Sequence, residues 1–234
     1  MSVYGGPDIV TDGLVLHLDA ANRKSYPLSG STIYDLSGNG NNGTINGATF
    51  DANNNGSFDF NGSSNYIAIT NPYRNFTNEI TVEWWTKRNG TLAGGSGWGM
   101  SQQNTDTVNN TYFLMHSSNN TGMTFYVRDP SFNAWRALSF GADSVDTSPC
   151  HLVGTVSSSK VATYKNGNLI GTATGMSGNM TTYASPIIHL GKDPRYASGR
   201  FYDGNIYTAI VYNRELSADE IAQNYNALKG RFGL

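Results

Sequence analysis

The chain has 234 residues, a length that fits one large all-β domain or two small ones. Its 27 glycines, 14 tyrosines and only 14% charged residues are typical of a turn-rich, weakly charged β protein. A net charge of −2 leaves no basic surface for nucleic acid or an anionic membrane, and no run reaches the ~18 apolar residues of a membrane span, so neither is an expected partner.

The N-terminal stretch, residues 1–11, predicts an extended arm. Gly5-Gly6-Pro7 interrupts it, and a packed strand does not usually carry that triplet. We therefore expect residues 1–11 to contribute little to a core and to become ordered only against another subunit. The folded domain is expected to span residues 12–234.

A first strand and a turn-rich loop follow the arm. Residues 13–19, GLVLHLD, alternate apolar side chains as a half-buried strand does. Residues 34–50, YDLSGNGNNGTINGATF, are dense in Gly and Asn, which suits turns with positive φ. Asp35 and the carbonyls of residues 38–42 can instead hold Ca²⁺, which takes several oxygen ligands. Both interpretations stay open, and no cofactor is required.

Short strands at close spacing fill the middle of the chain. They are residues 57–60, 66–70, 79–87, 112–116, 122–128, 135–140, 150–156, 161–165 and 169–174. Asn166-Gly167 is a type I′ hairpin signal between the last two. Residues 94–99, GGSGWG, and residues 104–110 are expected as flexible loops within one domain. The single cysteine, Cys150, excludes an intrachain disulfide.

The C-terminal part predicts two strands and one helix. Residues 187–191 and 205–212 read as strands, separated by a polar loop that carries Arg195 and Arg200. Ser217, with Glu220 three residues later, has the spacing of a capping box. An apolar stripe at helical spacing follows, made of Ile221, Tyr225 and Leu228, and Gly230 is the expected stop.

This C-terminal pattern resembles the signature of laminin G-like, pentraxin-like modules of the concanavalin A-like lectin/glucanase superfamily. The matching residues are Gly204, Ile206, Tyr212, Asn213, Arg214, Leu216, Ser217, Asp219, Glu220 and Ile221. The resemblance implies an all-β, two-sheet antiparallel jelly-roll sandwich with one short C-terminal helix. One departure is that the family's acidic pair, which helps to hold a metal elsewhere, falls on Tyr207 and Thr208.

The hairpin at residues 151–172 resembles the central hairpin of the same family. Residues 13–27 and 34–50 closely resemble the opening of laminin G-like modules in structural proteins of tailed bacteriophages. That resemblance implies a virion surface protein: a head decoration protein, a capsid fibre or a tail-fibre adhesin. The implied partners are other virion proteins, further copies of this chain as a homo-oligomer, and a cell-surface glycan. MSVYGGPDIV lacks the basic and apolar regions of a secretory signal, so we expect synthesis in the host cytoplasm. The alternative is a bacterial carbohydrate-binding protein or a glycan-processing enzyme with an unrecognised site.

The carboxylates argue against catalysis. Glycoside hydrolases of this fold need two carboxylates around the scissile bond, on a Glu-x-Asp-x-(x)-Glu strand that the chain lacks. Glu79 and Glu83 share a predicted strand at ~13 Å separation, too far apart for the known geometries. His17 and His151 are expected as fold residues. We therefore predict a protein that binds and does not react.

Sugar binding needs an aromatic platform and a few polar groups. The candidate ligand-binding residues are Trp98, Trp85, Trp135, Tyr126 and Arg128. Trp85 follows Trp84 on a strand, so one of the two faces the core and the other the opposite surface. For each aromatic side chain the competing interpretation is core packing, because large aromatic residues are mostly buried. Trp98, among glycines, has no apolar strand to bury it.

Overall fold

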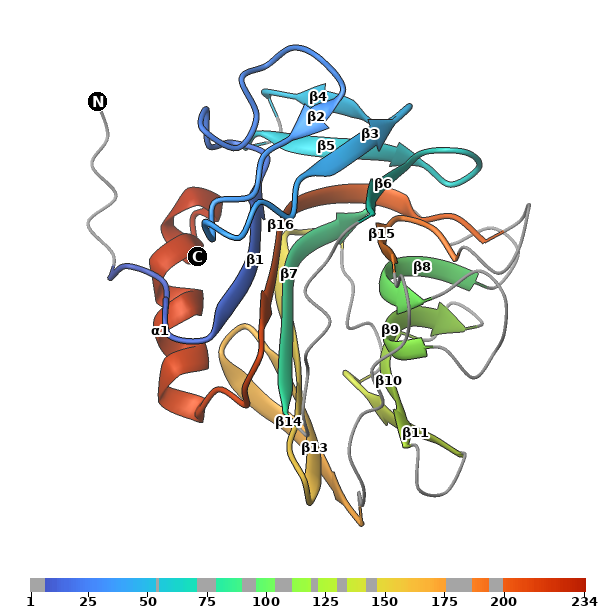
Figure 1. Ribbon diagram of the computed structural model, residues 1–234, viewed down its shortest axis with the longest axis vertical. Helices are drawn as coiled ribbons and strands as arrows, with labels where there is room; N and C mark the ends of the chain where they lie inside the picture. Colours follow the sequence, from blue (N-terminus) through green and yellow to red (C-terminus); the bar gives the residue numbers. More distant parts are fainter. Residues whose placement is uncertain are drawn as a thin grey trace.

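Two antiparallel sheets lie face to face in the computed structural model of the protein (Figure 1). Sheet A consists, in spatial order, of β14 (Asn168–Thr174), β13 (Lys160–Lys165), β12 (Cys150–Val156), β7 (Ile80–Arg88), β16 (Asp203–Tyr212), β5 (Ser57–Asn61) and β4 (Thr49–Asp51), with β1 (Leu14–Asp19) paired to β16. Sheet B consists of β11 (Ala134–Ser139), β10 (Met123–Asp129), β9 (Thr111–Ser118), β8 (Ser96–Gln103), β15 (Ile187–Leu190), β6 (Tyr66–Ile69), β3 (Gly43–Asn46) and β2 (Thr32–Ile33). The predicted two-sheet jelly-roll sandwich is confirmed.

The structure describes residues 7–53, 55–70, 79–89, 96–103, 111–118, 122–129, 134–141, 147–175, 187–193 and 200–234. The expected loop at residues 104–110 lies outside these ranges. None of the helices in the described ranges has the length and apolar character needed to cross a membrane.

The main core fills the space between the two sheets. In β7 and β12 every second side chain points inward, and Val82, Trp84 and Leu152 are all fully buried there. Trp84 packs against Tyr202, with 5.4 Å between the ring centroids. Cys150 is buried in the same cluster and forms no disulfide. A core of this size does not need a disulfide for stability.

The strand and hairpin predictions in the second half of the chain are confirmed. The predicted strand at residues 150–156 is β12, and those at 161–165 and 169–174 match β13 and β14 to within one residue. The turn between them has positive φ at both central positions, 51° at Asn166 and 77° at Gly167. That is the geometry of a type I′ turn, in which the Asn-Gly pair is favoured.

The expectation of a loop at residues 94–99 is wrong for the part that the structure describes. Residues 96–99 belong to β8, which pairs with β9 on one side and β15 on the other. Glycine is required here for packing, because a Cβ at Gly99 would overlap the Trp84 ring from the opposite sheet. The turn-rich loop at residues 34–50 also contains two short strands, β3 and β4.

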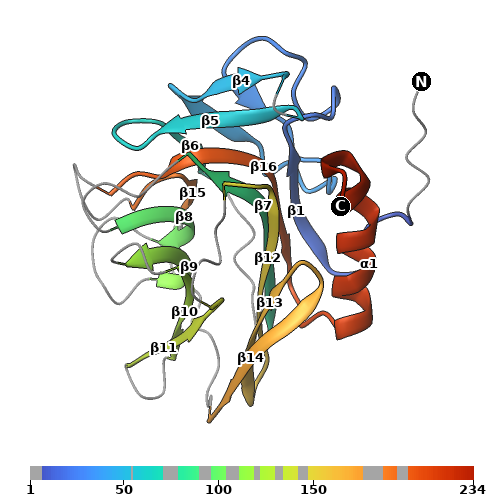
Figure 2. The same ribbon diagram turned by 180° about the vertical axis from the view of Figure 1, so that it is seen from behind.

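Helix α1 (Ala218–Leu228) lies along one side of sheet A (Figures 1 and 2). It continues into a 3₁₀ turn (Lys229–Phe232), so the helical conformation does not stop at Gly230 as predicted. The capping box is confirmed: Ser217 Oγ accepts from the Glu220 amide, and the Glu220 carboxylate accepts from the Ser217 amide. Arg214 makes a two-pronged ion pair with Glu220, at 2.6 and 3.0 Å. This pair lowers the pKa of Glu220 to about 2, through the hydrogen bonds from the guanidinium.

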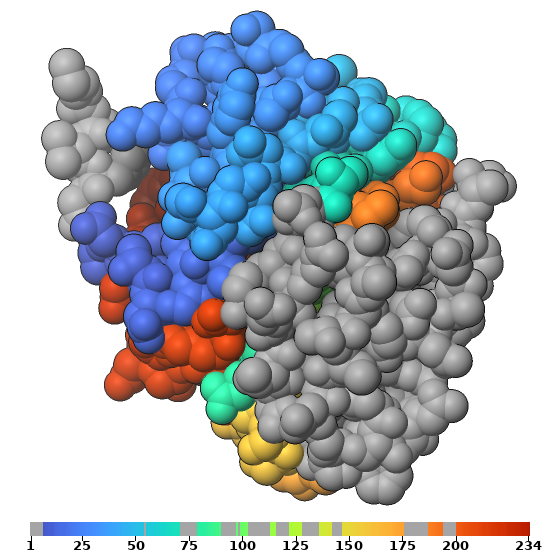
Figure 3. All heavy atoms as spheres, viewed as in Figure 1, coloured from blue at the N-terminus to red at the C-terminus, as the bar shows by residue number. Residues whose placement is uncertain are grey.

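The end of the expected N-terminal arm is part of the folded domain. Val10 is buried in a second apolar cluster with Ile210, Tyr212 and Ile221, between sheet A and helix α1. Its amide donates to Asn224 Oδ1 at 2.8 Å, and its carbonyl accepts from the Tyr212 hydroxyl at 2.9 Å. In the space-filling view this N-terminal segment lies against the C-terminal helix (Figure 3). The boundary at residue 11 is therefore too late, because residues 8–10 bind the helix.

Candidate functional site

Helix α1 and the 3₁₀ turn cover the outer face of sheet A around Trp85. Trp85 points to this face and is fully buried, stacked on Tyr225, Phe232 and His151 with ring centroids 5.6, 4.4 and 5.2 Å away. The prediction that Trp84 and Trp85 face opposite ways is confirmed. The proposed ligand role of Trp85 is not supported, because a ring enclosed on this face has no surface to offer a sugar.

A buried polar cluster lies under the same helix. Glu83, 1% exposed, contacts His151 Nε2 through one carboxylate oxygen at 3.1 Å and accepts from Asn224 Nδ2 through the other at 2.7 Å. Asn224 also donates to the Tyr212 hydroxyl at 3.0 Å. Burial and the nearby Glu83 carboxylate raise the pKa of Tyr212 well above its ordinary value. A histidine and a glutamate this far from solvent fix the helix to the sheet, which confirms His151 as a fold residue.

The remaining glutamates also have structural partners. Glu79 accepts a hydrogen bond from the Glu215 amide at 3.3 Å. Glu215 forms an ion pair with Lys160 at 2.8 Å, and Glu220 completes the helix cap. The chain has no other glutamate. All four glutamates therefore take part in hydrogen bonds or ion pairs within the fold.

The outer face of sheet B carries a continuous cross-strand row of residues. Direct pairing links Thr32, Thr44, Ala68, His189, Ser101, Leu114, Tyr126 and Ala137, one from each strand from β2 to β11. Their strand neighbours Ile67, Ile188 and Phe125 point into the main core, so the row faces away from it. Tyr126 is partly exposed, as is Ala68, whereas His189, Ser101 and Leu114 are buried.

Four of the five predicted ligand residues lie in sheet B, on strands β8, β10 and β11. Tyr126 and Arg128 are in β10, and Arg128 pairs directly with Trp135 of β11. Trp98 is in β8, opposite His116 of β9. The side chains of Trp98, Arg128 and Trp135 lie outside the described residues, so their backbone positions alone are assigned. The structure thus brings Tyr126, Arg128 and Trp135 together on β10 and β11, places Trp98 two strands away from β10, and separates all four from Trp85.

A second group of side chains lies on this outer face at β6 and β15, and no sequence pattern predicted it. Tyr66 lies beside His189, with ring centroids 6.0 Å apart, and Lys192 Nζ lies 4.5 Å from the centre of the Tyr66 ring. Phe201 faces Lys192 from the next segment, in an isolated bridge that pairs the two residues. Burial, reinforced by Lys192, lowers the pKa of His189 to about 4. No spacing in the sequence indicates this group, because its members come from three separate segments.

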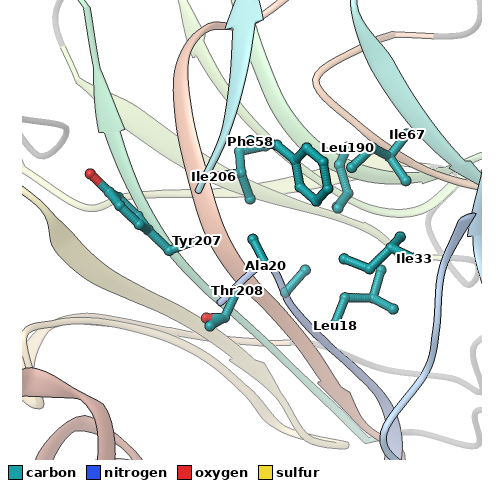
Figure 4. A pocket seen from close by; sticks show the side chains of 10 residues that line it. Leu18, Ala20, Ile33, Phe58, Ile67, Leu190, Ile206, Tyr207 and Thr208 are labelled. Atoms are coloured by element: carbon teal, nitrogen blue, oxygen red, sulfur yellow. The ribbon is translucent and has the colours of Figure 1, made fainter. Parts of the chain in front are cut away.

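Described residues also line two hollows. One is an internal cavity of about 10 Å³ between the sheets, around which apolar side chains such as Leu18, Ile33 and Phe58 converge (Figure 4). It has room for about one water molecule and no ligand. The other is an open hollow of about 370 Å³ beside the end of helix α1, lined by Asp19, Asn22 and Arg231 among others. Arg231 already binds Asp19 and the carbonyls of Asn55 and Gly56.

The Asp35 loop uses its carboxylate to hold the protein's own chain. One carboxylate oxygen accepts from the amides of His17 and Ser37, and the other from the Ser37 hydroxyl and the Asn41 amide, at 2.7 to 3.0 Å. Among the described residues, no three His, Cys, Asp or Glu side chains gather as metal ligands would. The described contacts thus explain the loop's Asp, Ser and Asn residues as turn-stabilising groups. The Ca²⁺ expectation stays a prediction.

The sandwich, with one sheet closed by a helix and the other carrying aromatic and polar side chains, defines a lectin-like fold. A family model described as the concanavalin A-like lectin/glucanases superfamily matches residues 61–222. The chain therefore belongs to that superfamily, of laminin G-like type, as its C-terminal pattern predicted. A search of curated proteins found no significant match.

Solved structures with the same fold include receptor-binding domains of bacterial toxins. The binding domain of botulinum neurotoxin serotype D/C VPI 5993 superposes with a TM-score of 0.69 at 16% identity, covering 93% of this chain and 53% of that one. The botulinum neurotoxin DC binding domains in complex with rat synaptotagmin II and with SialylT each give 0.70 at 15% identity, covering 94% and 93% of this chain and 52% of each. This chain spans about half the length of those domains, and the likeness shows the fold alone.

Proposed function

We propose that the protein is a non-catalytic, lectin-like module that binds glycan through the outer face of sheet B. The observation that carries this proposal is the contrast between the two outer faces. On sheet A, the rings of Trp85 and His151 are fully buried under helix α1. On sheet B, the side chains of Tyr66 and Tyr126 remain partly exposed. Partly exposed aromatic side chains beside polar groups are what a pyranose ring requires.

A binding role is also supported by the fate of the carboxylates. Each glutamate holds the fold together, at the helix cap, under the helix or beside Lys160. General acid catalysis of glycoside cleavage needs a carboxyl group within reach of the glycosidic oxygen. The matched toxin domains are themselves described as binding domains, one of them in complex with rat synaptotagmin II and another with SialylT. We therefore expect no product release from β-glucans, alginate or agar incubated with the purified protein.

The proposal extends to a virion surface, where the module acts as a head decoration protein, a capsid fibre or a tail-fibre adhesin. Its support is the resemblance of residues 13–27 and 34–50 to the opening of laminin G-like modules in tailed-phage structural proteins. In that setting the partners are other virion proteins, or copies of this chain, together with a cell-surface glycan. Capsid or tail genes beside the gene, and the protein's recovery from purified particles by mass spectrometry, are the expected findings. Neighbouring genes for polysaccharide metabolism would favour a bacterial carbohydrate-binding protein instead.

A glycan array tests the binding face. Wild-type protein is expected to bind at least one glycan, and Tyr126→Ala is expected to weaken that binding by about tenfold, the order of one lost aromatic contact. The matched control is Tyr34→Ala, which removes an exposed tyrosine at the far edge of the sheet, beyond β2. Equal loss in both variants, or no loss in Tyr126→Ala, would place the site elsewhere.

A further inference from the structure

Lys192 occupies an unusual position among the cations of the described residues. It follows β15, and its Nζ atom lies 4.5 Å from the centre of the Tyr66 ring and 5.7 Å from that of Phe201. Lys192 and Tyr66 are partly exposed, while Phe201 and His189 are buried behind them. Two aromatic rings therefore hold an ammonium group at the surface of sheet B.

The charge of Lys192 is not neutralised by a described carboxylate. By contrast, Lys160 forms an ion pair with Glu215 at 2.8 Å, and Arg231 forms one with Asp19 at 2.8 Å. The neighbouring Asp193 is fully buried and lies 3.7 Å from Arg200, away from solvent. Aromatic rings attract a cation through their quadrupoles without cancelling its charge. A net positive charge thus remains at this position.

Nothing else beside Lys192 supplies a compensating anion among the described residues. His189 lies against Tyr66, its Nδ1 atom is buried and has no hydrogen-bond partner, and its low pKa keeps the ring neutral above about pH 5. The Tyr66 hydroxyl has no hydrogen-bond partner among the described residues either. The group therefore combines one unpaired cation, one free hydroxyl and an apolar floor that excludes water on one side.

We propose that Lys192 and Tyr66 form a subsite for the anionic group of an acidic sugar residue, so that the module recognises negatively charged glycans. The Lys192 ammonium binds the carboxylate or sulfate of the sugar by a charge-assisted hydrogen bond, and the Tyr66 hydroxyl donates a second one. The rings under the ammonium reduce its freedom and its hydration, which strengthens the contact. This inference rests on the proposed glycan-binding function and names the ligand class that it takes.

Matched pairs of polymers separate charge from sugar identity. Polygalacturonate is compared with its fully methyl-esterified form, dextran sulfate with dextran, and polysialic acid is added as a third anionic polymer. Wild-type protein is expected to bind at least one anionic polymer about tenfold more tightly than its neutral counterpart, and polysialic acid is compared with dextran. A tenfold difference is the contribution of about one hydrogen bond to a charged group. Preference for the galacturonate or sialate arm assigns a carboxylate, and preference for the dextran sulfate arm assigns a sulfate.

Substitutions then connect the charge preference to this subsite. Lys192→Met keeps the apolar stem and is expected to abolish the preference, whereas Lys192→Arg keeps it. Lys24→Met removes the same charge from an exposed site outside the sheet and is expected to change nothing. Tyr66→Phe retains the ring against Lys192 and is expected to weaken binding a few-fold, which tests the subsite even if Lys192→Met folds poorly.

The outcomes distinguish this inference from the function on which it rests. Binding to neutral and charged polymers alike, or a charge preference that survives both Lys192→Met and Tyr66→Phe, overturns the subsite and leaves the glycan-binding function standing. Binding that falls equally in Lys24→Met shows a general charge effect and also overturns it. Absence of binding to these polymers and to every glycan on the array overturns both.

Discussion

Asn224 connects three parts of the fold, and its replacement by alanine is the sharpest test of the packing described above. Its side chain makes three hydrogen bonds: it accepts from the Val10 amide and donates to Glu83 and to the Tyr212 hydroxyl. Two of these partners are neutral and one is a carboxylate. At about 1 kcal/mol for each neutral bond and 1.5–3 kcal/mol for the charged one, Asn224→Ala should cost about 3–5 kcal/mol of the free energy of unfolding.

Asn226→Ala is the matched control, since Asn226 lies exposed on the same helix. The two substitutions change helix propensity alike, so their difference isolates the buried network. Urea unfolding followed by tryptophan fluorescence gives both values. A loss of about 3–5 kcal/mol corresponds to a melting temperature roughly 6–20 °C lower for a chain of this size.

Hydrogen exchange adds a local measurement to the same experiment. The Val10 amide should be protected in the wild type and in Asn226→Ala, and should exchange much faster in Asn224→Ala. If the free energies of unfolding of Asn224→Ala and Asn226→Ala differ by less than about 1 kcal/mol, the buried network is not what holds the helix to sheet A.

Three further predictions concern packing and pH. Gly154→Ala should destabilise the fold by about 1–3 kcal/mol, because a Cβ at this position would lie 2.5 Å from the Phe125 ring. In the control Gly171→Ala the nearest atom to the new Cβ is 3.7 Å away, so the urea midpoint should change little. Equal effects of the two substitutions would contradict this explanation. The imidazole of His189 should titrate near pH 4 by NMR, so stability should fall as pH drops from about 6.5, the unfolded pKa, toward 4; a midpoint near 6.5 would mean that the ring is solvated. Glu220 has a folded pKa of about 2, so its contribution is present above about pH 4.5 and is lost as pH falls through 2. The melting-temperature deficit of Glu220→Gln should therefore disappear toward pH 2, and a deficit independent of pH would refute the ion-pair explanation.

Local patterns predicted much of the fold. Alternating side chains located most strands, Asn166-Gly167 predicted the hairpin turn, and the spacing of Ser217 and Glu220 predicted the helix start. These features depend on neighbours in the sequence, so a single chain contains them. The strand β8 was missed because its glycines suggested a loop, whereas one of them, Gly99, is needed to accommodate Trp84 from the other sheet.

The candidate site was predictable only in part, because side-chain exposure depends on elements far apart in sequence. Alternation placed Trp85 on the face opposite Trp84, but nothing local showed that the C-terminal helix covers that face. Tyr126 was found from its strand position. The group at Lys192 was missed because Tyr66 and Phe201 approach it from distant segments.

The packing of residues 8–10 against helix α1 places both of these segments on the side of the molecule opposite the candidate binding face. Both the segment at Val10 and the C-terminal helix lie over the outer face of sheet A, away from sheet B (Figure 2). A support attached through either of these two segments would approach from that side and leave the sheet B surface pointing outward. An anchor that binds residues 8–10 or helix α1 would therefore leave Tyr126 and Lys192 uncovered, and the same geometry would present many copies on a surface in one orientation.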